Sequence, residues 1–200
     1  MWKKSKTPGT RAKIDYIPGW RNIRWMVYPE NKYDTCGYTA ACMLLYYYHK
    51  EPGKLFEKVV PAEFFGKDKK LLTEGYTLQD KLIQYASINS SWGWSVAKVL
   101  NLYFEEYHIP AKAHFGLFRL GAYRKLKAGT PVILFGNLPR HKEDLSDVKN
   151  RINHAVLAYG TMKKEKKWPQ FIVHYGWKNR AYNVLTNAII GSYCYITAKE

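Results

Sequence analysis

The sequence predicts an α+β fold, because helical patterns dominate the earlier part of the chain and strand patterns dominate its last third. Residues 30–128 carry mainly helical apolar spacing, whereas residues 129–200 contain short apolar runs separated by Gly, Pro and charged turns. A doubly wound parallel sheet would require the two kinds of element to alternate. The 200 residues are 46% hydrophobic and 16% aromatic, so we expect a single domain with one core over residues 1–200.

The chain is expected to begin with an extended lead-in over residues 1–29, because Pro and Gly interrupt its isolated aromatic residues. A buried helix is predicted over residues 36–49, where Asp34 and Thr35 are suitable N-caps and small residues precede a run of leucines and tyrosines. A Pro-Gly pair after Glu51 ends this helix.

The remaining elements follow from apolar spacing and from turn residues. Further helices are predicted over residues 78–86, 95–107 and 117–127. Strands are predicted over residues 132–135, 154–159, 171–175 and 189–197, and together they indicate an antiparallel sheet. The charged segment 139–151 is expected to be a surface loop beside a functional site.

The net charge of +16 creates a positive field that attracts anionic partners, such as an anionic cell-surface polymer. The basic residues are scattered rather than clustered with stacking aromatics, so the pattern does not favour nucleic acid. No segment approaches the ~20 apolar residues of a membrane span, and the basic segment 1–11 lacks the apolar core of a signal peptide. We expect a soluble monomer, either secreted or cell-surface with its signal peptide already removed, or cytoplasmic.

Cys36 is the candidate nucleophile. The 3 cysteines are an odd number, so at least one thiol is unpaired. The start of a helix stabilises a thiolate through the macrodipole, and the amide of Cys36 itself can donate to an oxyanion. Gly37 is expected to leave room for a substrate backbone. The alternative is that Cys36 is a small buried core residue.

His154 is the candidate base, because it begins an apolar strand directly after the charged loop. An imidazole there can take a proton from a thiol and later return it. The alternative is a structural histidine at a strand end. Cys42 is expected in the core and Cys194 in a strand, and the other histidines share no ligand spacing with the cysteines, so we expect no metal and no cofactor.

Two segments resemble the papain-like cysteine peptidases, most closely the branch of the bacteriocin-processing leader peptidases and their secreted bacterial relatives. They are Asp34 to Leu44, around Cys36, and His154 to Gly160, preceded by the strand-like Thr130 to Leu134. The resemblance covers roughly Tyr28 to Trp177 and is patchy in the middle. It implies a papain-like cleft between the helix of Cys36 and the strand of His154, thiolate attack, an acyl-enzyme and hydrolysis of a peptide bond.

The chain departs from this family at two site positions. The family has Asn or Asp where this chain has Tyr175, so we expect Tyr175 to shield or bind His154, with His174 or Asn179 as alternatives. The oxyanion-hole Gln corresponds to Glu30, whose carboxylate would repel an oxyanion, so either Asn31 donates instead or the backbone amide acts alone.

Two other functions remain open from the sequence. A thiol amidase or acyltransferase would use the same cysteine and histidine on cell-wall or isopeptide bonds and would leave short peptides uncut. A catalytically dead binding module would use the cleft or the basic surface, and the two departures from the family pattern favour it.

Overall fold

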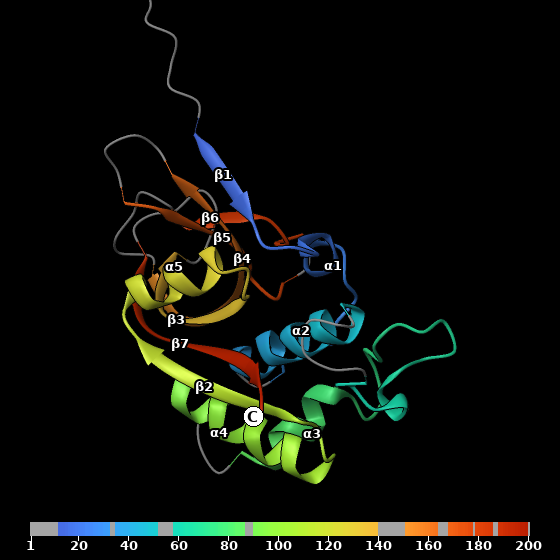
Figure 1. Ribbon diagram of the computed structural model, residues 1–200. Helices are drawn as coiled ribbons and strands as arrows, with labels where there is room; N and C mark the ends of the chain where they lie inside the picture. The colour runs from blue at the N-terminus through green and yellow to red at the C-terminus, as the bar shows by residue number, and fades with distance from the viewer. Residues whose placement is uncertain are drawn as a thin grey trace, which may run out of the picture.

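Helices pack against an antiparallel sheet in the computed structural model, which describes residues 12–32, 35–51, 58–86, 90–139, 151–163, 168–177, 179–185 and 188–199 (Figure 1). The helices are α1 (Trp20–Arg24), α2 (Cys36–Lys50), α3 (Leu78–Gln84), α4 (Gly93–Glu106) and α5 (Arg119–Lys127), with a 3-10 turn at Ala62–Phe64. The strands are β1 (Lys13–Tyr16), β2 (Ala111–Leu117), β3 (Val132–Pro139), β4 (Arg151–Lys163), β5 (Gln170–His174), β6 (Asn183–Leu185) and β7 (Ile189–Ala198).

The sheet has the strand order β2-β7-β3-β4-β5-β6, and β1 pairs with β4 outside this path. All these pairings are antiparallel. The central strands β3 and β4 are rich in Val, Ile, Leu and Phe because both of their faces are buried. Their register places Gly136 opposite His154 and Asn137 opposite Asn153.

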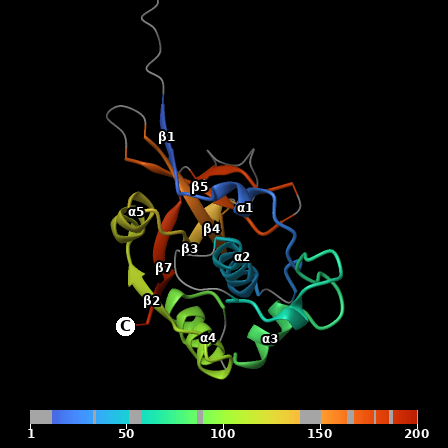
Figure 2. The same cartoon turned by 45° about the vertical axis from the view of Figure 1, so that its right-hand side comes forward.

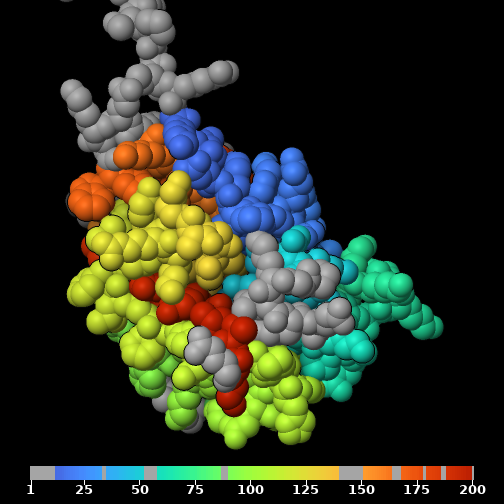
Figure 3. All heavy atoms as spheres, in the orientation of Figure 1, coloured from blue at the N-terminus to red at the C-terminus, as the bar shows by residue number. Residues whose placement is uncertain are grey.

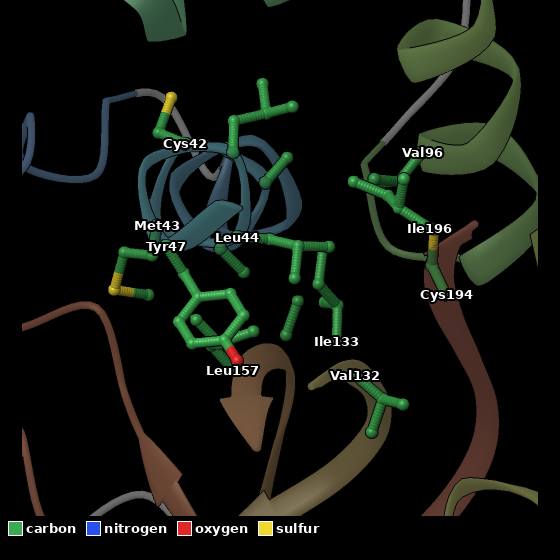
Figure 4. Close-up of a cluster of buried hydrophobic side chains, with 14 of the residues drawn as sticks. Cys42, Met43, Leu44, Tyr47, Val96, Val132, Ile133, Leu157, Cys194 and Ile196 are labelled. Atoms are coloured by element: carbon green, nitrogen blue, oxygen red, sulfur yellow. The ribbon is translucent and has the colours of Figure 1, made fainter. Parts of the chain in front are cut away.

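Helix α2 lies between the sheet and helices α3 and α4 (Figure 2). Its residues 36–48 are all buried, which explains why polar residues are scarce in this helix. Leu44 and Tyr47 extend from the helix toward Ile133 and Leu157 of the sheet (Figure 4). The hydroxyl of Tyr47 donates to the carbonyl of Pro18 at 2.9 Å, which fixes the carboxyl end of α2 beside the lead-in.

The α+β class and the helix at Cys36 are confirmed, and Thr35 is the N-cap residue, although its side chain makes no capping hydrogen bond. Asp34 and residues 140–150 of the expected charged loop lie outside the described residues. Among the described residues, no helix has both the length and the apolar character needed to cross a membrane.

Three strands, β1, β2 and β6, were not predicted, and neither was helix α1 within the expected extended lead-in. The lead-in contains β1, which pairs with β4, and the predicted helix over residues 117–127 was wrong at its start, because Leu117 ends strand β2. Strand β2 lies at the edge of the sheet, where Lys112 and Phe115 face solvent, so its apolar pattern is weak. Helix α5 begins only at Arg119.

Candidate active site

Cys36 is the first residue of α2 and is 7% exposed. The amides of Tyr38 and Thr39 donate to the carbonyl of Thr35 at 2.9 and 3.1 Å, so the helix turn is closed around the cysteine. The amino end of a helix stabilises negative charge through its macrodipole and its backbone N–H groups. The local structure therefore suits a thiolate at Cys36.

A polar network holds the segment that precedes Cys36. The side-chain amide of Gln79 donates to the hydroxyls of Thr39 at 2.6 Å and Thr35 at 3.3 Å. The Thr35 hydroxyl lies 3.3 Å from Oδ1 of Asn31. Lys32 forms an ion pair of 3.0 Å with Asp80, next to Gln79 in α3. Helix α3 thus fixes both ends of residues 31–35.

Gly37 has a different role from the one that the sequence predicts. A Cβ atom at Gly37 would lie 2.1 Å from the carbonyl oxygen of Ser90 and 2.9 Å from Cγ2 of Val96. The space beside Gly37 is therefore filled by the segment that leads into α4, and not left for a substrate. The expectation of substrate room was wrong, and the glycine instead brings the wall containing Ser90 against the first turn of α2.

His154 lies near the start of β4 and is enclosed by aromatic rings. Its Nε2 is 3.0 Å from the backbone carbonyl oxygen of Tyr175. The ring stacks on Trp177 at a centroid distance of 4.6 Å and on Tyr175 at 5.5 Å. Because a carbonyl oxygen only accepts, Nε2 must carry the hydrogen, which leaves Nδ1 as the basic nitrogen.

Burial lowers the pKa of His154 from 6.5 to about 4, and the hydrogen bond to Tyr175 opposes that shift. The imidazole is only 5% exposed, so water stabilises its charged form poorly. His154 is therefore neutral near pH 7, which is the form that can act as a base.

The two candidate residues lie at the same end of the sheet. A Cβ at Gly176 would lie 3.0 Å from Cγ2 of Thr39, in the first turn of α2. Gly176 directly follows Tyr175, whose carbonyl holds His154. The opposite end of α2 lies near Pro18, through Tyr47. The amino end of α2 and the start of β4 thus converge beside residues 175–176.

A cleft of about 340 Å³ opens on the β3–β7 side of this end. Its wall includes Ser91 and Trp92, from the segment that packs on Gly37, together with Gly136 and Asn153. Gly136 is the register partner of His154. The cleft therefore adjoins β4 through Asn153, and its Ser91 wall directly follows Ser90, which packs on Gly37 of α2.

The structure separates the alternatives for the third position. Tyr175 contributes its carbonyl to His154, while its hydroxyl donates to the carbonyl of Pro139 at 2.8 Å. His174 lies on the opposite face, where its Nδ1 accepts from the amide of Gly176 at 2.9 Å. Asn179 has a φ of 63° in the turn after β5 and lines a separate cavity. The catalytic roles of these residues stay predictions.

The two oxyanion candidates also differ in their surroundings. Asn31 is half-buried and is linked to Thr35, the residue before Cys36. Glu30 is exposed, and its charge contributes to raising the pKa of Tyr28 to about 12, although burial is the larger cause. Asn31 is thus the better-placed donor, and its role stays a prediction.

Gln79 and Trp177 are neighbours of the site that the sequence analysis missed. Trp177 had a signal, since an aromatic residue after the expected third position can cover the histidine. Gln79 had none, because it lies 44 residues from Thr35 in the chain. Among the described atoms, Oε1 of Gln79 is buried without a hydrogen-bond partner.

The other cysteines are core residues, as expected. Cys42 points away from the sheet on the far side of α2, and Cys194 lies in β7 near Val96 (Figure 4). Complete burial raises the pKa of both thiols well above its usual range. These two thiols are therefore unreactive near pH 7.

No family model and no curated protein matches this sequence. Among solved structures, the chain is similar to a Bacillus anthracis protein provisionally named a C39-like peptidase. The two sequences are 13% identical, the TM-score is 0.46, and the match covers 92% of this chain and 98% of the other. This distant likeness extends over nearly the whole of both chains.

Proposed function

We propose that the protein is a cysteine peptidase in which Cys36 is the nucleophile and His154 the general base. The observation that carries this proposal is the bond of 3.0 Å between Nε2 of His154 and the carbonyl of Tyr175. It leaves Nδ1 as the basic nitrogen at the end of the sheet where α2 begins with Cys36. A neutral imidazole and a thiol at a helix start are the two groups that acyl transfer requires.

In the proposed reaction, Nδ1 of His154 takes the thiol proton of Cys36 as the sulfur attacks the substrate carbonyl. The tetrahedral oxyanion accepts hydrogen bonds from the amide of Cys36 and from the side-chain amide of Asn31. His154 then protonates the leaving amine, and a thioester remains on Cys36. A water molecule gives a proton to His154 and attacks the thioester, the carboxylic acid product is released, and the departing Cys36 sulfur takes the proton back from His154.

The carbonyl of Tyr175 takes the place that a side-chain Asn or Asp has in the resembled family. It fixes the ring orientation and the tautomer, but it carries no full charge to stabilise the imidazolium. Trp177 covers one side of the ring and keeps water from competing for the bond. We therefore expect a neutral imidazole that accepts the thiol proton of Cys36 as the sulfur attacks an electrophile, rather than a preformed ion pair.

The first test is the alkylation of Cys36 by iodoacetamide between pH 5 and 9, with the labelled cysteine located by mass spectrometry. We expect labelling at pH 6 to be faster than that of a free thiol, and His154→Ala to slow it. His174→Ala is the matched control, because that histidine is equally buried but does not face the site. Labelling of Cys36 no faster than a free thiol would reject the enzyme and favour the binding module.

A second measurement separates a peptidase from a thiol amidase or acyltransferase. The wild-type protein and Cys36→Ala are incubated with a library of unmodified peptides, and new termini are identified by mass spectrometry. A peptidase produces cleavage that depends on Cys36. A reactive Cys36 without any peptide cleavage would favour the amidase or acyltransferase.

A further inference from the structure

A second cavity, of about 470 Å³, lies on the β5–β6 side of β4 and is separate from the cleft beside Gly136. Its lining includes Arg24, Trp25, Tyr28, His174, Trp177 and Tyr182, and none of the lining residues that the structure describes is Asp or Glu. Strand β1, in blue, lies beside β4, in orange, in Figure 3. The cavity thus combines aromatic walls with a positive charge.

The guanidinium of Arg24 packs against three aromatic rings. Its guanidinium carbon lies 5.8 Å from the ring centroid of Trp20, 5.0 Å from that of Trp25 and 4.9 Å from that of Tyr182. Among the described residues, its side chain has no carboxylate partner and no hydrogen-bond acceptor. Aromatic rings hold the faces of a guanidinium, and its N–H donors lie along the edge, where they match a carboxylate.

The cavity lies where the part of a substrate that follows the scissile bond would bind. Trp177 both lines the cavity and stacks on His154. In acyl transfer the imidazole protonates the leaving amine, so the chain that follows the scissile bond must pass beside His154. The sheet order places the cleft at β3 and β7, and the Arg24 cavity at the end of β5 and the segment that follows it, on the other side of β4.

We propose that this cavity binds a carboxylate in the leaving-group half of the substrate, with Arg24 as its partner. This inference rests on the proposed peptidase function and names a substrate class for it: peptides that carry a carboxylate shortly after the scissile bond. The carboxylate is either the free C-terminus of the peptide or an acidic side chain. In both cases the two oxygens of the carboxylate accept hydrogen bonds from the guanidinium.

The test uses three peptide libraries with the same randomised, N-acetylated sequences. One ends in a free carboxylate, one in an amide, and one in an amide preceded by Glu. We expect the wild type to cleave one carboxylate library at least ~10-fold faster than the plain amide library, as a charge-assisted hydrogen bond allows. Arg24→Gln should reduce this ratio to about twofold or less.

Arg21→Gln is the matched control. Arg21 belongs to the same helix and also stacks on Trp20, at 4.9 Å, but it is exposed and does not line the cavity. The control should keep the full preference. Thermal unfolding of both variants shows whether each remains folded at the assay temperature.

Binding without turnover separates the two proposals. Fluorescence titration of Cys36→Ala with acetyl-trialanine as the acid and as the amide, and with acetyl-Ala-Ala-Glu amide, measures recognition alone. We expect tighter binding of a carboxylate form, and loss of that preference in the double variant of Cys36→Ala and Arg24→Gln. This result would support carboxylate binding in the cavity even if the wild type cleaved no library. In that case only the proposed peptidase function would be rejected. Equal binding and equal cleavage of all three, or equal losses in Arg21→Gln and Arg24→Gln, would overturn the inference.

Discussion

Two buried histidines lie on neighbouring strands of the sheet, and only one has the surroundings of a base. Burial lowers the pKa of both His154 and His174 from 6.5 to about 4. His154 binds a carbonyl through Nε2, so its other nitrogen stays basic. Nδ1 of His174 accepts a hydrogen bond from the amide of Gly176, and the His174 and Tyr28 rings pack edge to face. Burial and pKa are alike, so the hydrogen-bond partner is what separates them.

The largest expected effect is on catalysis by His154. We expect His154→Ala to lower kcat/KM by ~1,000-fold or more, because general base catalysis contributes up to about four orders of magnitude. His174→Ala should lower kcat less than ~10-fold, since this ring lies on the opposite face of the sheet from His154, and any effect on KM is assigned to the Arg24 cavity, which His174 lines. Peptide hydrolysis at pH 7.5 measures both. Similar losses in two variants of equal thermal stability would remove the distinction between the histidines.

Stability in acid should, in contrast, depend on both histidines alike. An unfolded histidine binds a proton below pH 6.5, whereas each folded one does so only below about 4, so stability is full above pH 6.5 and falls as the pH decreases toward 4. The loss is on the order of 3 kcal/mol for each histidine. Urea unfolding at pH 7 and pH 4.5 measures it. His154→Gln and His174→Gln should each remove about half of the loss, and an unchanged loss in both would contradict the assigned cause.

The sequence identified the histidine strand and the cysteine helix because both depend on local patterns: an apolar run after His154, and small residues after Cys36 with Thr35 before them. It named Tyr175 as the residue expected to shield or bind His154, but it did not indicate that the backbone carbonyl of Tyr175 makes the contact. A backbone carbonyl is present at every position, so the composition around Tyr175 carries no signal for it.

Long-range packing explains the other differences between sequence and structure. Gln79 reaches Thr35 across 44 residues, and the Gly37 contact is set by the carbonyl of Ser90 in another segment. Strands β1 and β2 are short and half-exposed, and they are fixed by their partners β4 and β7 rather than by their own propensity. Such features appear only after the chain is folded.

Removing the aromatic cover should make His154 easier to protonate. Because the neutral imidazole is the base, activity is present above its pKa and is lost as the pH falls through about 4. Trp177→Leu admits water, raises this pKa toward 6.5 and should move the acidic limb of kcat/KM upward by ~1 pH unit. Trp92→Leu is the control, since this exposed tryptophan lines the other cleft. If the acidic limb of kcat/KM stayed at the same pH in Trp177→Leu, the indole of Trp177 would not be the cause of the lowered pKa of His154.

The smallest expected effect tests whether the third position acts through its backbone or its side chain. Tyr175→Phe keeps the carbonyl that holds His154 and the ring that stacks on it, but removes the hydroxyl bonded to Pro139. Activity should remain within about threefold, while the free energy of unfolding falls by ~1 kcal/mol for the lost hydrogen bond. Peptide hydrolysis and urea unfolding measure the two quantities. A 100-fold loss of kcat at unchanged stability would instead assign the orienting role to the phenol, and the backbone carbonyl would no longer distinguish His154 from His174.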